Sequence, residues 1–127
     1  MSTGQKIAIF MLVLMIPMVI LLPKSENELG EVGTIEYNID STRDVVYFSW
    51  SAARNADGYQ VYVLLLEKNQ DYVLAGEVER AQVDIKGFIT GESYSVKVRP
   101  FKETDGQKEY GKYSNALTFS YGQYDLV

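Results

Sequence analysis

Residues 45–63 read VVYFSWSAARNADGYQVYV, and this stretch decides the fold. It contains two runs in which apolar residues alternate with other residues: Val46, Phe48 and Trp50, followed by Tyr59, Val61 and Val63. An Ala-Asp-Gly turn signal lies between the runs. Alternation with a period of two in β-branched and aromatic residues predicts strands with one buried face. We therefore expect two antiparallel strands around Trp50, the only tryptophan of the chain.

Similar short runs continue along the rest of the chain, and turn-forming residues separate them. They predict seven strands, at residues 34–40, 45–50, 58–66, 72–76, 82–86, 93–101 and 115–121. No helical periodicity follows residue 22, so we predict an all-β, seven-stranded antiparallel β-sandwich of the immunoglobulin-like class. Three leucines at residues 64–66 break the alternation. A strand covered on both faces, a bulge and an exposed patch remain open as explanations.

Four short motifs occur in an order that resembles a fibronectin type III domain over residues 33–121. They are Phe48-Ser-Trp50, Gly58-Tyr-Gln-Val-Tyr62, Phe88-Ile-Thr-Gly-Glu-Ser-Tyr94-Ser-Val-Lys-Val98 and Gly111-Lys-Tyr113-Ser114-Asn115. The resemblance implies a buried Tyr94 whose hydroxyl bonds to nearby backbone. The residues expected in the core are Trp50, Tyr59, Tyr94, Phe48 and Phe88. The chain lacks the family's prolines at the first strand and after Trp50, and it lacks an Arg-Gly-Asp tripeptide.

The composition argues against the common kinds of catalysis. The chain contains no histidine and no cysteine. The usual general base of a Ser or Cys nucleophile is therefore missing, as is the commonest ligand of catalytic zinc. We expect a non-enzymatic protein without a metal or other cofactor, and without disulfides. The formal net charge of -5 argues against a nucleic-acid partner, because such binding depends on clustered Lys and Arg.

Residues 7–22, IAIFMLVLMIPMVILL, carry no charge and predict a membrane helix or a signal sequence. A helix of this length covers about 24 Å, somewhat less than the ~30 Å hydrocarbon core. The segment after Met18 lacks the small residues of a signal peptidase site, which favours a retained anchor over cleavage near residue 25. Lys6 and the α-amine precede the span, so we expect residues 1–6 in the cytoplasm and the rest outside it.

The remaining chain divides into a linker at residues 23–33, the fibronectin type III domain at 34–121 and a tail at 122–127. The polar, acidic linker reaches at most about 36 Å when extended, so it would keep the domain near the membrane. If successive strands alternate in direction, the linker enters at the pole that holds loops 51–57 and 102–114. The C-terminus then leaves at the opposite pole.

Two groups of residues are candidates for binding. The predicted loop at 102–114 carries tyrosines among lysines, a composition typical of recognition surfaces. The candidate protein-binding loop comprises Tyr110, Lys112, Tyr113 and, from the neighbouring loop, Arg54. The alternative is a solvated hairpin whose tyrosines pack against the sheet. Outward tyrosines on the strands, Tyr47 and Tyr62, suggest an aromatic face for carbohydrate, unless they simply cover a sheet.

These features predict a membrane-anchored interaction or spacer module outside the cytoplasm, with residues 7–22 in the membrane and a protein as its partner. An accessory subunit of a membrane complex fits the short span and the short linker. The alternative is a secreted fibronectin type III module that binds carbohydrate or protein after signal cleavage.

Overall fold

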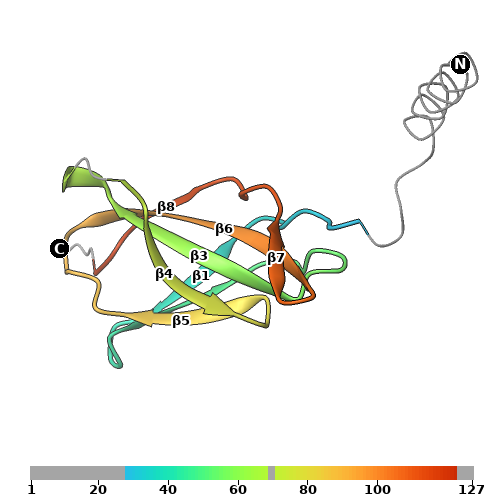
Figure 1. Ribbon diagram of the computed structural model, residues 1–127. Helices are drawn as coiled ribbons and strands as arrows, with labels where there is room; N and C mark the ends of the chain where they lie inside the picture. Colours follow the sequence, from blue (N-terminus) through green and yellow to red (C-terminus); the bar gives the residue numbers. More distant parts are fainter. Residues whose placement is uncertain (1–27, 69–70, 123–127) are drawn as a thin grey trace, which may run out of the picture.

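The computed structural model describes residues 28–68 and 71–122 of the chain (Figure 1). This part contains one short 3-10 helix, η1 (Leu66–Lys68), and the following eight strands: β1 (Glu36–Asp40), β2 (Val45–Ser49), β3 (Gly58–Leu65), β4 (Val73–Val78), β5 (Gln82–Lys86), β6 (Ser93–Thr104), β7 (Gln107–Tyr110) and β8 (Leu117–Ser120). The predicted all-β class is confirmed for these residues. The predicted count of seven strands is wrong for the same residues, because β7 was expected to be part of a loop.

The predicted membrane or signal segment at residues 7–22 lies outside the described residues. Residues 23–27 of the predicted linker and 123–127 of the predicted tail also lie outside them. Within residues 28–68 and 71–122, no helix has the length and apolar character needed to cross a bilayer.

Two antiparallel sheets form a β-sandwich. The smaller sheet has the strand order β1-β2-β5. The larger sheet has the order β4-β3-β6-β7, with β8 also paired to β6. Figure 1 shows the larger sheet in front of β1. Residues on the inner faces of the two sheets alternate with outward residues along each strand, so the core lies between the sheets.

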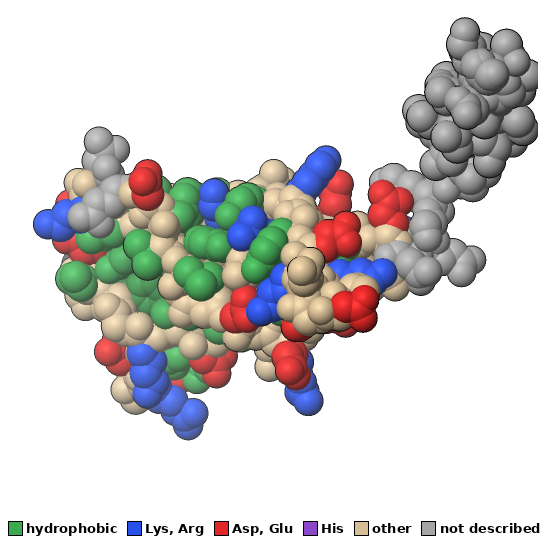
Figure 2. Space-filling view, in the orientation of Figure 1, with side chains coloured by type: hydrophobic (Ala, Val, Ile, Leu, Met, Phe, Trp, Pro, Cys, Tyr) green, Lys and Arg blue, Asp and Glu red, His purple; other side chains and the backbone are tan. Residues whose placement is uncertain are grey.

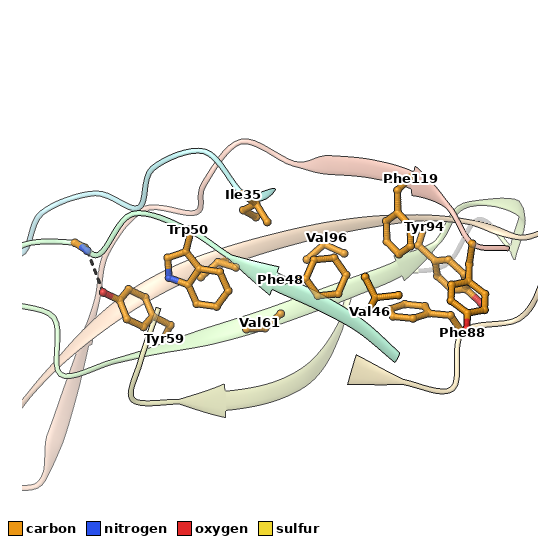
Figure 3. Close-up of a cluster of buried hydrophobic side chains, with 13 residues drawn as sticks. Ile35, Val46, Phe48, Trp50, Tyr59, Val61, Phe88, Tyr94, Val96 and Phe119 are labelled. Carbon is orange, nitrogen blue, oxygen red and sulfur yellow. Dashed lines mark hydrogen bonds between the residues drawn. The ribbon is translucent and has the colours of Figure 1, made fainter. Parts of the chain in front are cut away.

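The core is a continuous layer of aromatic and β-branched side chains, and all five predicted core residues are buried in it. Figure 3 shows Trp50 and Tyr59 at one end of this layer and Phe88 with Tyr94 at the other. The ring centroids lie 5.4 Å apart in the Trp50–Tyr59 pair and 4.6 Å apart in the Phe88–Tyr94 pair. Both pairs have the edge-to-face geometry that aromatic rings favour. Trp50 therefore closes one end of the core, while Phe48 occupies its middle.

The tyrosine hydroxyls at both ends of the core accept hydrogen bonds from the backbone. The Ile89 N–H donates to the Tyr94 hydroxyl over 2.8 Å, as the family resemblance implied. The Ala53 N–H donates to the Tyr59 hydroxyl over 3.0 Å. Each bond pairs a polar group that would otherwise be costly to bury beside apolar rings.

The three leucines mark the end of a strand. Leu65 is the last residue of β3 and packs against the core, whereas Leu66 begins η1 and is exposed. A bulge does occur in this sheet, but earlier, where the pairing of β3 with β4 shifts between Val61 and Tyr62. The loss of alternation at residues 64–66 therefore reflects a change from strand to helix.

The predicted loop at residues 102–114 begins as a β-hairpin. Strand β6 continues to Thr104 and pairs with β7 through a two-residue turn at Asp105 and Gly106. Both turn residues have positive φ, 53° and 81°, as a type I′ hairpin turn requires. The hairpin projects beyond the core, so its residues are mostly exposed and show no apolar alternation. Periodicity could not detect it, although the Asp-Gly pair is a hairpin signal.

Candidate functional site

The outer face of the larger sheet carries a row of tyrosines and cations. Alternate residues of a strand point to opposite faces of its sheet. In β6, Tyr94, Val96 and Val98 face the core, so Lys97 and Arg99 face outward. Both cations are nevertheless half-buried, because aromatic side chains from other segments cover them. Figure 2, seen from the same side as Figure 1, shows basic side chains set among hydrophobic ones on this face.

Rings and cations alternate along this row. The Lys97 ammonium lies 4.1 Å from the centre of the Tyr72 ring and 4.0 Å from that of Tyr113. The Arg99 guanidinium carbon lies 5.0 Å from the Tyr113 ring centre and 4.0 Å from that of Tyr110. We call Tyr72, Lys97, Tyr113, Arg99 and Tyr110 the tyrosine–cation row. Each such contact contributes about 0.5–1 kcal/mol at an exposed site and more where water is excluded.

A hydrogen-bond network beneath the row holds the Arg99 guanidinium in place. Arg99 Nε donates to Gln60 Oε1 over 3.0 Å, and a terminal nitrogen of Arg99 donates to the Tyr62 hydroxyl over 3.2 Å. The Tyr62 hydroxyl donates in turn to Gln60 Oε1 over 2.8 Å. Gln60 Nε2 donates to Glu77 over 2.9 Å, and Lys108 Nζ donates to the other Glu77 oxygen over 3.2 Å. The buried Gln60 therefore links the arginine to a carboxylate-lysine pair.

Two pKa values reflect these contacts. The hydrogen bond from Gln60, followed by that from Lys108, lowers the pKa of Glu77 below its ordinary value of 4.5. Burial raises the pKa of the Tyr113 hydroxyl, and a hydrogen bond with Tyr62 adds to this rise. The carboxylate stays charged and the tyrosine stays neutral near pH 7.

No acid among the described residues neutralises either cation at the centre of the row. In residues 28–68 and 71–122, Lys108 pairs with Glu77, Lys112 with Glu31, and Arg43 with Asp40. Lys97 and Arg99 form no ion pair with any of the described residues. The row therefore shows two positive charges on a protein whose net charge is negative.

A second feature lies at one pole of the sandwich, where residues 28–33 meet the hairpin and loop 51–57. The Gly30 N–H donates to the Arg54 carbonyl over 2.8 Å, and Lys112 Nζ lies 3.4 Å from a carboxylate oxygen of Glu31. The predicted entry of the linker at this pole is confirmed, and its described part rests against the domain. A hollow of about 360 Å³ here is lined by the following residues: Glu28, Leu29, Gly30, Glu31, Arg54, Glu109, Tyr110, Gly111 and Lys112.

One glycine allows this close approach. A Cβ atom at Gly111 would lie 2.9 Å from Pro100 Cγ and 3.1 Å from Leu29 Cδ2. A larger residue at position 111 would therefore crowd Pro100, and the end of the Leu29 side chain would have to shift.

The predicted binding residues separate into these two features. Arg54 and Lys112 line the pole hollow, Tyr113 belongs to the row, and Tyr110 contributes to both. The two tyrosines pack against the sheet, as in the hairpin alternative.

The prediction of one aromatic face from Tyr47 and Tyr62 is wrong. Tyr47 lies on β2 of the smaller sheet and Tyr62 on β3 of the larger one, so they point to opposite sides of the sandwich. The Tyr62 ring also packs edge-on against Tyr113, with 5.4 Å between the centroids, and is not a free stacking platform.

The cations of the row were missed as site residues. Alternation along residues 93–101 places Lys97 and Arg99 on the outer face of their strand, but they were not predicted to be site residues. The sheet register brings Lys97 opposite Tyr62 and Arg99 opposite Gln60. Strand pairing was the signal needed to find the row, because its members come from separate segments.

The cations of the row can attract negatively charged groups, and its tyrosine rings can pack against apolar or aromatic groups. In the part of the chain that the structure describes, no group of three or more Asp or Glu residues is placed to hold a metal ion.

Several solved structures of known proteins resemble this fold. No protein-family model matches the sequence, and no curated protein matches it. The Fn3-like protein from Clostridium thermocellum is 17% identical with a TM-score of 0.58, over 80% of this chain and 100% of that chain. The fn3 domain of the human collagen alpha-1(XX) chain is 16% identical with a TM-score of 0.61, over 82% of this chain and 95% of that chain.

These likenesses establish the fold. The described part of the chain is a fibronectin type III-like domain, as its motifs predicted.

Proposed function

We propose that this chain is a membrane-anchored interaction module outside the cytoplasm, and that it presents the tyrosine–cation row to a protein in the same membrane. The observation that carries the proposal is the position of residues 28–33 against one pole, beside Arg54 and Lys112. An anchor at residues 7–22 would hold this pole next to the bilayer. The strands would then run roughly perpendicular to the membrane plane. The outer faces of both sheets would be turned toward proteins beside the domain in the same membrane.

The length of the connection supports a partner close by. Residues 23–27 separate the predicted span from the described pole, and five residues reach at most about 18 Å. A domain held this close meets proteins beside it more readily than proteins on another membrane. This arrangement is compatible with an accessory subunit of a membrane complex.

The chemistry of the row supports binding over a purely spacing role. Tyrosine and arginine are enriched among the residues that dominate protein interfaces. Tyr110 and Tyr113 are each 41% exposed, so part of each ring remains available to a partner. On the same face as the row, Leu74 of β4 pairs with Tyr62 and is 47% exposed. A surface that combines exposed aromatic, aliphatic and cationic groups fits a protein partner.

Site-specific photo-crosslinking in membranes of the native host tests this proposal. A photoreactive residue at Leu74 would sample the outer face of the larger sheet, because Leu74 pairs with Tyr62. The matched control places it at Asp84, which is exposed on the smaller sheet and pairs with Tyr47. We expect adducts to a membrane protein from position 74 and few from position 84. No adduct at position 74, or equal adducts at both, would contradict a partner on this face.

The intact mass of the recovered protein separates the anchored form from the secreted alternative. A full-length mass that resists carbonate extraction is expected for an anchor. A mass lacking about the first 25 residues, found in the medium, would show that the chain is a secreted module.

A further inference from the structure

We propose that the partner meets the tyrosine–cation row with an acidic protein segment, and that Lys97 and Arg99 select it. This inference rests on the proposed function, because it names the chemistry of the same partner. It follows from the local charge, the geometry of the two cations and the apolar groups beside them.

The local charge differs from that of the molecule as a whole. The chain carries a formal charge of -5, yet Lys97 and Arg99 on the outer face of the larger sheet have no acid partner among the described residues. Lys108 on the same face pairs with Glu77 and lies opposite Glu103, so it adds no net positive charge. Glu77 is the carboxylate that the hydrogen-bond network contacts, and Lys108 and Gln60 already occupy its oxygens. At physiological salt, charges more than about 8 Å away are largely screened. An approaching segment therefore meets a locally positive surface.

The two cations are held in position before any partner arrives. Rings on both sides of Lys97 restrict its ammonium, which forms no hydrogen bond with the described residues. Two donors of Arg99 are bound by Gln60 and Tyr62, and a guanidinium has five. The remaining donors can bind carboxylate oxygens, for which the planar fork of arginine is well matched. Prior ordering also reduces the entropy that binding would cost.

The surroundings of the row favour a protein over an acidic polysaccharide. Leu74, which pairs with Tyr62, and the half-buried Leu64 of β3 present aliphatic surface on this face. A polypeptide can place apolar side chains on this patch and carboxylates on the cations at the same time. A uronic acid polymer would leave the aliphatic patch uncovered. The partner segment is therefore a polypeptide in which Asp or Glu lies close to apolar residues.

The test repeats the crosslinking from position 74 with two charge variants of the full chain. Lys97→Gln/Arg99→Gln removes both cations of the row. The matched control, Arg80→Gln/Lys86→Gln, removes two positive charges beside and on β5 of the smaller sheet. We expect the adduct yield to fall about tenfold in the first variant, equivalent to about 1.4 kcal/mol, and to stay within about twofold in the control.

Three further measurements use the wild-type chain, so they remain informative if the double variant does not fold. The adduct yield should decrease as salt is raised from about 0.05 to 0.5 M, because charge pairs at a surface are screened. Added poly-glutamate should compete, whereas polygalacturonate should compete less. Mass spectrometry of the adduct should identify a segment with clustered Asp or Glu.

The outcomes separate this inference from the proposed function. An adduct whose yield ignores salt and the row variant would overturn the acidic segment while leaving a partner on this face. Equal losses in the two variants would show an effect of net charge, and would also overturn the role of Lys97 and Arg99. Stronger competition by polygalacturonate than by poly-glutamate would favour a glycan and overturn the inference. Absence of any adduct at position 74 would contradict both proposals.

Discussion

The two faces of strand β6 differ in the interactions that their side chains make. On its inner face, Val96 and Val98 are completely buried among apolar groups of both sheets. On its outer face, Lys97 and Arg99 are half-buried by tyrosine rings, and Gln60 and Tyr62 fix the guanidinium. Burial of apolar surface drives folding in proportion to the area removed from water. Cation–π contacts and partly exposed hydrogen bonds contribute less to stability and more to position and specificity.

This contrast predicts that substitutions on the inner side impair folding and that those on the outer side impair recognition. The sole tryptophan, Trp50, lies in the core and reports on unfolding by its fluorescence in urea. The following changes test the contrast, beginning with the largest expected effect on stability.

Phe48→Ala should destabilise the domain most. Phe48 lies in the middle of the core and packs edge-on against Phe88 and Phe119, with ring centroids 6.1 and 5.6 Å away. Truncation would remove that packing and leave a cavity, at a cost of about 3–5 kcal/mol. Ser49→Ala, at the exposed next position, is the matched control and should stay within about 0.5 kcal/mol. Equal unfolding midpoints for the two variants would show that the core assignment is wrong.

Tyr94→Phe isolates one polar contact of the core. The change keeps the ring but leaves the Ile89 N–H without the hydroxyl that accepts its hydrogen bond. We expect a loss of about 1–3 kcal/mol in the free energy of unfolding. Tyr110→Phe is the comparison, because the Tyr110 ring lies in the row and its hydroxyl forms no hydrogen bond with the described residues. If Tyr110→Phe lowered the free energy of unfolding as much as Tyr94→Phe, the proposed difference between the core and the row would be contradicted.

Arg99→Gln should cost less stability than either core change, about 1 kcal/mol, from the loss of its contacts with Tyr110 and Tyr113. Arg99→Gln should, however, lower the adduct yield from position 74 more than either core change does in the fraction of protein that is folded. Lys86→Gln on the smaller sheet provides the control for a single lost charge. If Arg99→Gln lowered the free energy of unfolding as much as Phe48→Ala, the main role of the row would be to stabilise the fold, as the core does.

The smallest expected effect concerns pH. Hydrogen bonds from Gln60 and Lys108 lower the pKa of Glu77 in the folded state below the ordinary 4.5. Their stabilising contribution is therefore present above about pH 4.5 and is lost as the pH falls through the folded-state pKa. Glu77→Gln lacks this titration, so the difference in urea midpoint between wild type and variant should shrink at low pH. A difference that is constant between pH 6 and pH 3 would mean that Glu77 does not contribute.

Sequence reasoning succeeded where one strand carries its own signal. Strand β5 was predicted at residues 82–86 and is found at Gln82–Lys86. The corner at Tyr94 was implied by the family resemblance and forms as expected. These features depend on residues within about a dozen positions of one another, and alternation shows which face of each strand is apolar.

The failures concern strands that lack an apolar face and side chains whose neighbours come from other strands. The β6–β7 hairpin projects past the core, so no apolar face marks its strands. The supposed aromatic face joined Tyr47 to Tyr62, although their strands belong to different sheets. A side chain's outward direction can be inferred from its own strand, but its neighbours depend on which strands lie beside it.

The sequence by itself determined the sandwich and the composition of its core, because apolar alternation records how each strand divides between water and the interior. Only the tertiary structure decided that Tyr72, Lys97, Arg99, Tyr110 and Tyr113 form one row. The register of β3 with β6, and the return of the hairpin over the sheet, bring these residues together. Cation–π attraction acts only over a few ångströms, so no periodicity along the chain can encode it.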